Sequence, residues 1–181
     1  MVQALLDRVA QLRLAVSATT RPRRPDERDG EHYWFLSDEE FDRRLAAGDF
    51  LEYNVFPWGQ RSGTLRSELD RIADEGSVPL LELELNGAAA AKRALPGAVV
   101  VFVDAPLEEL ERRLRERATE SAGEIEERIV LAAEQRARAG DFDYVVVNDD
   151  RERTASECVA IVERELARDV YGHPGKARVS S

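Results

Sequence analysis

Cysteine and long apolar segments are scarce in this sequence, and each scarcity narrows the class of protein. The single cysteine, Cys158, cannot form a disulfide within the chain, so a reducing cytoplasm is the expected compartment. It falls in the apolar stripe of a predicted late helix, and we interpret it as a core residue. No apolar run approaches the roughly 20 residues that cross a membrane, and no long apolar core of a signal peptide follows Met1. We therefore expect no membrane partner.

A surplus of basic residues is also lacking. The formal net charge is −10, with 36 acidic and 26 basic residues. A general nucleic-acid binder needs a basic face that neutralises phosphates, and no such face is expected outside residues 21–24. Nucleic acid is therefore not an expected partner. Hydrophobic residues make up 43% of the 181 positions, which is typical of a soluble globular protein large enough to bury a core.

Two arginines and a tyrosine within residues 17–64 have the chemistry to bind a phosphate group. Arg21 and Arg24 lie three positions apart across a proline whose fixed φ keeps the segment out of a helix. Two guanidinium groups so spaced can clamp one phosphate with charge-assisted hydrogen bonds, and the phenol of Tyr33 can donate a third. Taken alone, the two arginines fit a solvated basic loop between strands better.

A carboxylate follows at Glu52, directly after the apolar pair Phe50-Leu51 in a predicted strand over residues 50–55. We expect its side chain to project into the same cavity as the arginines. A carboxylate there could accept hydrogen bonds from a ring N–H and from a neighbouring amino group of a ligand.

These residues, followed by Gly63-Thr64, resemble the nucleoside-monophosphate-binding region of the guanylate kinase family, and the similarity continues to about Leu166. By this resemblance, the residues that hold the phosphate of GMP are Arg21, Arg24 and Tyr33. The residues that read guanine are Ser17, Glu52 and Thr64. Guanine offers a carboxylate its N1–H and an exocyclic amine, which adenine lacks at those positions. A buried Glu52 would therefore reject AMP.

The later part of the chain predicts an α/β fold. Residues 78–85 (V-P-L-L-E-L-E-L) read as a strand with Glu82 and Glu84 on one face near its carboxyl end, where open α/β sheets bind ligands and metal ions. A strand with a wet face is the alternative. The resemblance places Glu84 near Mg²⁺ and the acceptor phosphate, although the family usually has Asp there. The apolar run at residues 98–103 predicts a parallel strand covered on both faces.

Helices and strands alternate, which predicts a parallel sheet with helices on both faces. The resemblance makes this a P-loop-kinase-like sheet lacking its first strand. The expected domain covers residues 1–168, with a GMP-binding lobe at residues 21–63 and a helical lid at residues 113–128. A disordered tail is expected at residues 169–181. Further predicted elements are helices at residues 1–11, 37–48, 64–75, 88–95 and 151–168, and strands at residues 12–16, 32–36 and 141–147.

The resemblance also assigns residues to the donor side. The lid arginines that close over ATP and stabilise the transferring phosphoryl group, and so count as catalytic, are Arg113, Arg117 and Arg128. The adenine-contacting position is Asn148, and Arg117 also binds ATP. The segment Asn148-Asp149-Asp150 is equally typical of an ordinary turn and helix cap.

The sequence contains no G-x-x-x-x-G-K-[ST] segment, the loop whose amides cradle phosphates and whose lysine reaches the transferring group. Only two lysines occur, and the single Gly-Lys pair, Gly175-Lys176, lies in the predicted tail. In the family this loop precedes the helix that here begins at Met1. We therefore expect that the protein starts further upstream, and that the chain as given is weakly active or inactive.

The sequence thus predicts a kinase that transfers the γ-phosphoryl group of ATP, with Mg²⁺, to GMP, giving GDP. The alternative is a non-catalytic guanylate-kinase-like module that binds a nucleotide or a protein. Two departures favour the module: Ser62 replaces a phosphate-binding tyrosine of the family, and the loop after Glu52 is one residue longer. The side chain of Trp58 could fill the place of that tyrosine. The lid arginines favour the enzyme.

Overall fold

The computed structural model describes residues 1–56, 58–106, 133 and 136–172. It divides into two compact units, one of residue 2 and residues 10–98, the other of residues 1, 3–9 and those from 99 onwards. Among the described helices, none is both long and apolar enough to span a membrane.

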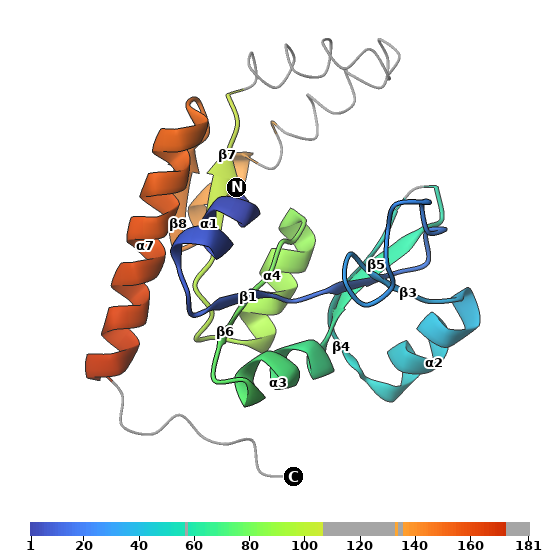
Figure 1. Ribbon diagram of the computed structural model, residues 1–181. Helices are drawn as coiled ribbons and strands as arrows, with labels where there is room; N and C mark the ends of the chain where they lie inside the picture. The colour runs from blue at the N-terminus through green and yellow to red at the C-terminus, as the bar shows by residue number, and fades with distance from the viewer. Residues whose placement is uncertain (57, 107–132, 134–135, 173–181) are drawn as a thin grey trace. The chain divides into compact units, whose positions relative to one another are not determined.

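The unit of residues 10–98 contains two sheets and three helices in its described part (Figure 1). The strands are β1 (Leu12–Leu14), β2 (Ser17–Thr19), β3 (Trp34–Phe35), β4 (Phe50–Val55), β5 (Arg61–Leu65) and β6 (Val78–Leu80). The helices are α2 (Asp38–Ala47), α3 (Arg66–Asp74) and α4 (Leu85–Ala94). β1 and β6 form a parallel pair in which Leu12 faces Val78.

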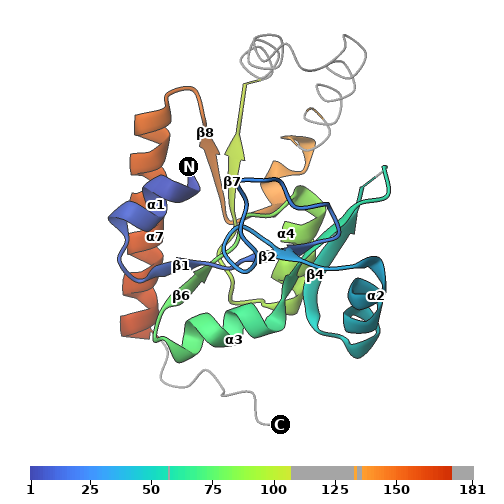
Figure 2. The ribbon, with the colours of Figure 1, turned by 45° about the vertical axis from the view of Figure 1, so that its right-hand side comes forward.

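The larger sheet of this unit has the strand order β3-β2-β5-β4. β5 runs antiparallel to both β2 and β4, whereas β3 is parallel to β2. Helix α2 packs against it (Figure 2) and inserts Phe41, which is fully buried and stacks on Phe50 with ring centroids 4.4 Å apart. Ala18 and Leu65 complete this apolar cluster. The cluster fixes the sheet from the side of α2.

Helix α2 begins and ends as its sequence predicts. The hydroxyl of Ser37 accepts a hydrogen bond from the backbone N–H of Glu40 at 3.1 Å, and Gly48 ends the helix with φ of 76°. Helix α3 differs from the prediction, because Leu65 occupies the N-cap position and no side chain caps it. The helix predicted at residues 64–75 begins later than predicted, because Thr64 still belongs to β5, and Ser67 already lies inside the helix.

The buried carboxylate of Glu68 joins α3 to the strands before it. Its oxygens accept hydrogen bonds from the backbone N–H of Val16 at 2.9 Å and from the indole N–H of Trp34 at 3.1 Å. Arg71, one turn further along α3, donates to both oxygens and balances the charge.

The second unit contains α1 (Val2–Arg8), β7 (Val101–Asp104), the 3-10 turn η1 (Ala139–Asp141), β8 (Tyr144–Val147) and α7 (Arg151–Gly172). β7 and β8 are parallel, and α7 lies along β8 (Figure 1). Arg8 of α1 makes an ion pair with Glu152 of α7, in which one nitrogen, Nη2, donates to both carboxylate oxygens at 2.7 and 2.9 Å. Cys158 is buried, and this burial raises the pKa of its thiol, which confirms it as a core residue.

Several predicted boundaries were wrong. The strand predicted at residues 78–85 ends at Leu80, its last residue paired with β1, so Glu82 and Glu84 do not lie on a strand. The helix predicted to end at residue 168 continues to Gly172, into the segment expected to be disordered. The predicted lid at residues 113–128 lies outside the described residues.

Candidate functional site

The register of the larger sheet brings together the three residues predicted to read guanine. Ser17 of β2 faces Thr64 of β5, and Thr64 in turn faces Glu52 of β4. We call this cross-strand set (Ser17, Thr64, Glu52) the base row. Thr64 and Glu52 are buried, with exposed fractions of 1% and 7%. The base row is thus a line of hydroxyl and carboxylate groups on three neighbouring strands, next to a register shift between Phe50 and Glu52 of β4.

Glu52 is the chemically distinctive member of the base row. Its Oε1 accepts a hydrogen bond from the hydroxyl of Thr64 at 2.8 Å. Burial raises the pKa of Glu52, and its hydrogen bonds from Thr64 offset this only in part. A buried carboxylate with one neutral partner gains free energy from any further donor that reaches it.

The second carboxylate oxygen of Glu52 lies against Gly87 in α4. A Cβ atom at position 87 would lie 2.7 Å from Oε2 and 3.3 Å from Cδ. Only glycine therefore leaves room for the carboxylate as it stands. The sequence did not single out Gly87, which directly precedes the alanine-rich helix predicted at residues 88–95.

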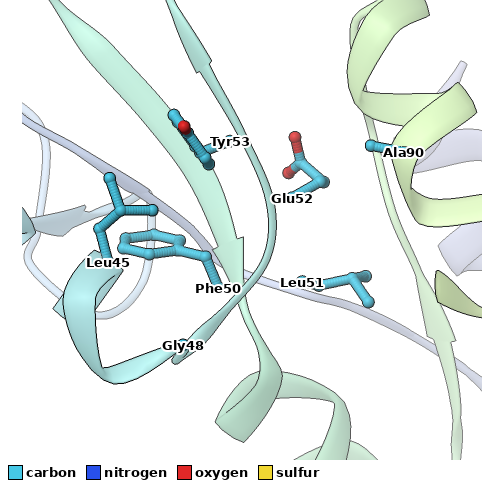
Figure 3. Close-up of a pocket in the computed structure, with 7 residues that line it drawn as sticks. All are labelled: Leu45, Gly48, Phe50, Leu51, Glu52, Tyr53 and Ala90. Atoms are coloured by element: carbon cyan, nitrogen blue, oxygen red, sulfur yellow. The ribbon is translucent and has the colours of Figure 1, made fainter.

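Glu52 also supplies the carboxylate of a cavity of about 210 Å³ between β4 and the neighbouring helices of the same unit (Figure 3). The other lining residues, which are mainly apolar, are Leu45, Gly48, Phe50, Leu51, Tyr53 and Ala90. Figure 3 shows the carboxylate between β4 and the helix that carries Ala90. A mainly apolar lining with few polar groups is common in small-molecule sites.

The predicted phosphate residues lie in the loop between β2 and β3, residues 20–33, which we call the clamp loop. The guanidinium carbon of Arg21 lies 5.3 Å from the ring centroid of Tyr33, within cation–π distance. It also lies 5.8 Å from the ring of Phe35. The structure thus places Arg21 and Tyr33, both predicted to bind the phosphate, side by side.

An acid that the sequence reasoning missed, Glu27, organises the clamp loop. Arg21 donates to it through both terminal nitrogens, at 3.0 and 2.6 Å. The backbone N–H of Arg24 donates to the same carboxylate at 2.8 Å. These contacts, Arg21 first, lower the pKa of Glu27 from 4.5 to about 2. The carboxylate is largely buried, at 8% exposure. Its only sequence signal was an acid among the arginines of a proline-rich loop.

Arg24 is placed differently from Arg21. Its side chain is exposed and makes no ion pair with any described residue. The two predicted phosphate ligands are therefore one fixed guanidinium and one exposed guanidinium on the same short loop.

Ser62 and Trp58 do not replace a phenol at the end of β5. The hydroxyl of Ser62 donates to the carbonyl of Ala18 at 3.0 Å. Trp58 is 66% exposed, stacks on Phe56 and donates to the side chain of Gln60 at 3.2 Å. Both side chains are thus occupied within the sheet and its hairpin.

Glu84 occupies the N-cap position of α4 and is exposed. The described residues hold no group of three or more His, Cys, Asp or Glu side chains suited to a metal ion. Mg²⁺ typically keeps water and phosphate ligands and needs only one or two carboxylates. The indirect role of Glu84 toward Mg²⁺ therefore stays a prediction.

Of the residues predicted to bind the phosphoryl donor ATP, only some lie in the described part of the chain. Asn148 follows β8, its N–H donates to the carbonyl of Asp104 at 2.7 Å, and Asp150 then caps α7 through the N–H of Arg153 at 2.8 Å. The segment therefore forms a turn and helix cap. Three predicted catalytic residues lie outside the described part of the chain: Arg113, Arg117 and Arg128.

Comparison with known proteins identifies the family of the chain. A family model described as guanylate kinase matches residues 1–165. The chain is 44% identical over 168 residues to a guanylate kinase of Rubrobacter xylanophilus, covering 92% of this chain and 87% of that protein. It is 41% identical over 169 residues to a guanylate kinase of Symbiobacterium thermophilum, covering 93% and 80% respectively.

The crystal structure of guanylate kinase from Anaplasma phagocytophilum superposes with a TM-score of 0.70 at 27% identity, covering 95% of this chain and 92% of that one. The fold is therefore α/β and P-loop-kinase-like, as predicted. The chain belongs to the guanylate kinase family.

Proposed function

We propose that this protein is a guanylate kinase, which transfers the γ-phosphoryl group of ATP to GMP and yields GDP and ADP. The observation that carries the acceptor assignment is Glu52, a buried carboxylate that has one oxygen on the hydroxyl of Thr64 and faces an apolar cavity. Family membership supports the reaction class.

Guanine suits the base row because its N1–H and 2-amino group are two parallel donors for one carboxylate. The hydroxyl of Thr64 lies next to that carboxylate and the hydroxyl of Ser17 lies on the next strand of the same row, and both can bond the remaining polar atoms of the ring edge. Adenine has an unprotonated N1 and no 2-amino group, so it would leave a buried acid unpaired. Such an unpaired acid discriminates against adenine far more strongly than a misfit of shape would.

The clamp loop would hold the 5′-phosphate. Arg21 and Arg24 are the cationic ligands, and the phenol of Tyr33 next to Arg21 is the neutral donor. No side chain needs to act as a nucleophile, because an oxygen of the GMP phosphate attacks the γ-phosphorus while the bond to ADP breaks. The protein then contributes mainly position and charge.

The family also suggests which residues would bind ATP and Mg²⁺. When bound, Mg²⁺ would neutralise phosphate charge during transfer, with Glu84 acting through its water ligands. The side chain of Asn148 would contact adenine, and the lid residues Arg113, Arg117 and Arg128 would neutralise charge as it develops. We propose GMP and ATP as the partners and the cytoplasm as the compartment.

A binding-only module is the second candidate, because Ser62 replaces a phosphate-binding tyrosine of the family and its hydroxyl is committed to the carbonyl of Ala18. Both candidates share the acceptor site. Only the enzyme forms GDP.

The test combines calorimetric binding with a coupled assay of GDP formation on the same protein. We expect GMP to bind and AMP to bind at least 100-fold more weakly, because of the unpaired acid. Glu52→Gln, which replaces an acceptor by an amide donor, should weaken GMP binding by roughly 100-fold. Glu39→Gln, at an exposed position of α2, is the matched control and should change nothing.

Equal binding of GMP and AMP, or no effect of Glu52→Gln, would show that the base row does not read guanine. Turnover on the order of 1–100 per second supports the enzyme. Tight GMP binding without GDP formation supports the binding module.

A further inference from the structure

We propose that Glu27 is a positioning residue that fixes Arg21, before the ligand arrives, with one edge of its guanidinium turned to the phosphate of GMP. The inference deepens the proposed function and rests on it. It assigns a role to an acid that lies next to an anion site and would otherwise repel the anion.

The pattern of donors on Arg21 carries the argument. A guanidinium has five N–H groups arranged along fixed edges. Nη1 donates to the carbonyl of Pro22 at 2.8 Å and to Glu27 at 3.0 Å, while Nη2 donates to Glu27 at 2.6 Å. Glu27 therefore occupies the end-on edge of the guanidinium, which is the edge that Nη1 and Nη2 form.

The phenol of Tyr33 also interacts with the guanidinium. The hydrogen bonds to Pro22 and Glu27 leave the side-on edge of Arg21 with two donors, the Nε–H and the second hydrogen of Nη2. They point in parallel, which is the geometry that binds two oxygens of one phosphate. Because Glu27 occupies the end-on edge, Arg21 can offer only this side-on edge. The carboxylate thus selects which face of the guanidinium a ligand meets.

Glu27 can do this because the loop holds it in turn. The backbone N–H of Arg24 donates to its Oε2 at 2.8 Å, and its own N–H donates to the carbonyl of Arg24 at 3.1 Å. Arg23 donates from its side chain to the carbonyl of Glu27 at 2.7 Å. The ring of Tyr33 supports the far side of Arg21. A long side chain fixed before binding loses less rotamer freedom on binding.

Arg21 and Arg24 then contribute differently to the binding of the phosphate. The Arg21–Glu27 pair is neutral as a unit and supplies direction. Arg24, which is exposed and has no ion pair among the described residues, supplies the uncompensated positive charge. Coulombic attraction alone predicts that removing the negative charge of Glu27 tightens the binding of a phosphate. A positioning role predicts instead that removing this charge weakens the binding of the phosphate. One measurement of affinity therefore separates the two explanations.

The test compares Glu27→Gln with Glu31→Gln in the full chain, with GMP affinity measured by calorimetry. Glu31 lies on the same loop, is exposed and pairs with Arg28, so its substitution removes the same charge without touching Arg21. We expect Glu27→Gln to weaken GMP about tenfold, since one bidentate charge-assisted contact loses its support. We expect Glu31→Gln to leave the affinity unchanged or slightly higher.

Two further measurements separate positioning from a general loss of structure. In an Arg21→Ala background, Glu27→Gln should have no additional effect on GMP affinity, because it acts through Arg21. Guanosine lacks the phosphate, so its binding should be equal in the wild type and in Glu27→Gln. If Glu27→Gln does not fold, Glu27→Asp keeps the charge but withdraws it by one methylene, and should still weaken GMP selectively.

Unchanged or tighter GMP binding by Glu27→Gln, or an equal loss in the Arg21→Ala background, would overturn the inference. A wild-type protein that does not bind GMP at all would instead overturn the proposed function. GMP binding that depends on Glu52 but not on Glu27 would overturn the positioning role alone.

Discussion

Two glutamates in one unit of the molecule show how differently the base row and the clamp loop are built. Burial among uncharged groups raises the pKa of Glu52. The guanidinium of Arg21 and a backbone N–H lower the pKa of Glu27 to about 2. The charge of Glu27 is therefore balanced within the protein, whereas that of Glu52 is not. Glu27 thus has its charged partner inside the protein, whereas in the proposed function the partner of Glu52 would be the ligand.

The two regions also owe their geometry to different forces. Strand register fixes the base row, and the apolar cluster around Phe41 supports the sheet that carries it. Ion pairs and a few backbone bonds fix the clamp loop, in which no regular structure longer than a bridge occurs. Substitutions in the core should therefore damage the base row first, and changes of charge should damage the clamp loop first.

The largest expected effect is that of Phe41→Ala. Phe41 is fully buried, stacks on Phe50 and lies under the guanidinium of Arg61. Removing a buried phenylalanine costs about 3–5 kcal/mol of unfolding free energy, a large share of the stability of a small domain. Denaturant unfolding measures this directly.

Phe35→Ala is the control on the side of the clamp loop. Phe35 is half-buried and contacts Tyr33 and Arg21. We expect it to cost less than half as much stability as Phe41→Ala but to weaken GMP binding in the folded protein. Equal losses of stability would mean that the two regions share one core, contrary to the comparison.

Gly87→Ala should separate binding from stability within the base row. The new methyl group would displace the carboxylate of Glu52, whose Oε2 would lie 2.7 Å away, while the helix itself tolerates alanine well. We expect a loss of about tenfold in GMP affinity, with unfolding free energy changed by less than about 1 kcal/mol.

Gly140→Ala is the matched control, because a Cβ atom at Gly140 would meet nothing within 4 Å. Gly140→Ala should change neither the affinity for GMP nor the unfolding free energy. Full GMP affinity in Gly87→Ala would show that the carboxylate can move without consequence, and so that it does not contact the base.

Local signals in the sequence were enough for helix α2. Its hydroxyl cap, first-turn acids and terminal glycine are all within the segment, so Ser37 and Gly48 were placed correctly. Family resemblance supplied the members of the base row, and the structure brings them together. The strand containing Glu84 was wrong because alternation of apolar residues does not reveal where a pairing partner ends.

Glu27 and Gly87 could not be predicted in this way. The role of Glu27 depends on a loop that folds back so that its carboxylate meets Arg21, and no periodicity marks such a closure. The role of Gly87 depends on contact with Glu52 on another element, far away in the sequence. Both are tertiary effects, and both lie at the proposed site.

The pH dependence of stability should show the two acids with opposite signs. The folded pKa of Glu27 lies below its unfolded value of 4.5, so its contribution is present above pH 4.5 and is lost as the pH falls to about 2. The folded pKa of Glu52 is raised, so its contribution is present at acid pH and is lost as the pH rises from 4.5 through the folded value.

Chemical unfolding between pH 2 and 8 tests this. Glu27→Gln should flatten the loss of stability below pH 4.5. Glu52→Gln should remove a loss of stability that the wild type shows above that pH. Identical pH profiles for both variants would mean that the two carboxylates do not differ as described.

The smallest expected effect is that of Trp58→Ala, which tests whether the hairpin tip belongs to either region. Trp58 is 66% exposed and contacts chiefly Phe56 and Gln60, its neighbours on the same hairpin. Unfolding free energy should change by less than about 0.5 kcal/mol, as for other surface substitutions. GMP affinity should stay within about twofold, since that factor is well under 1 kcal/mol of binding free energy. A tenfold loss of GMP affinity, measured by the same calorimetry, would instead make Trp58 the substitute for the missing phenol and extend the clamp to the hairpin.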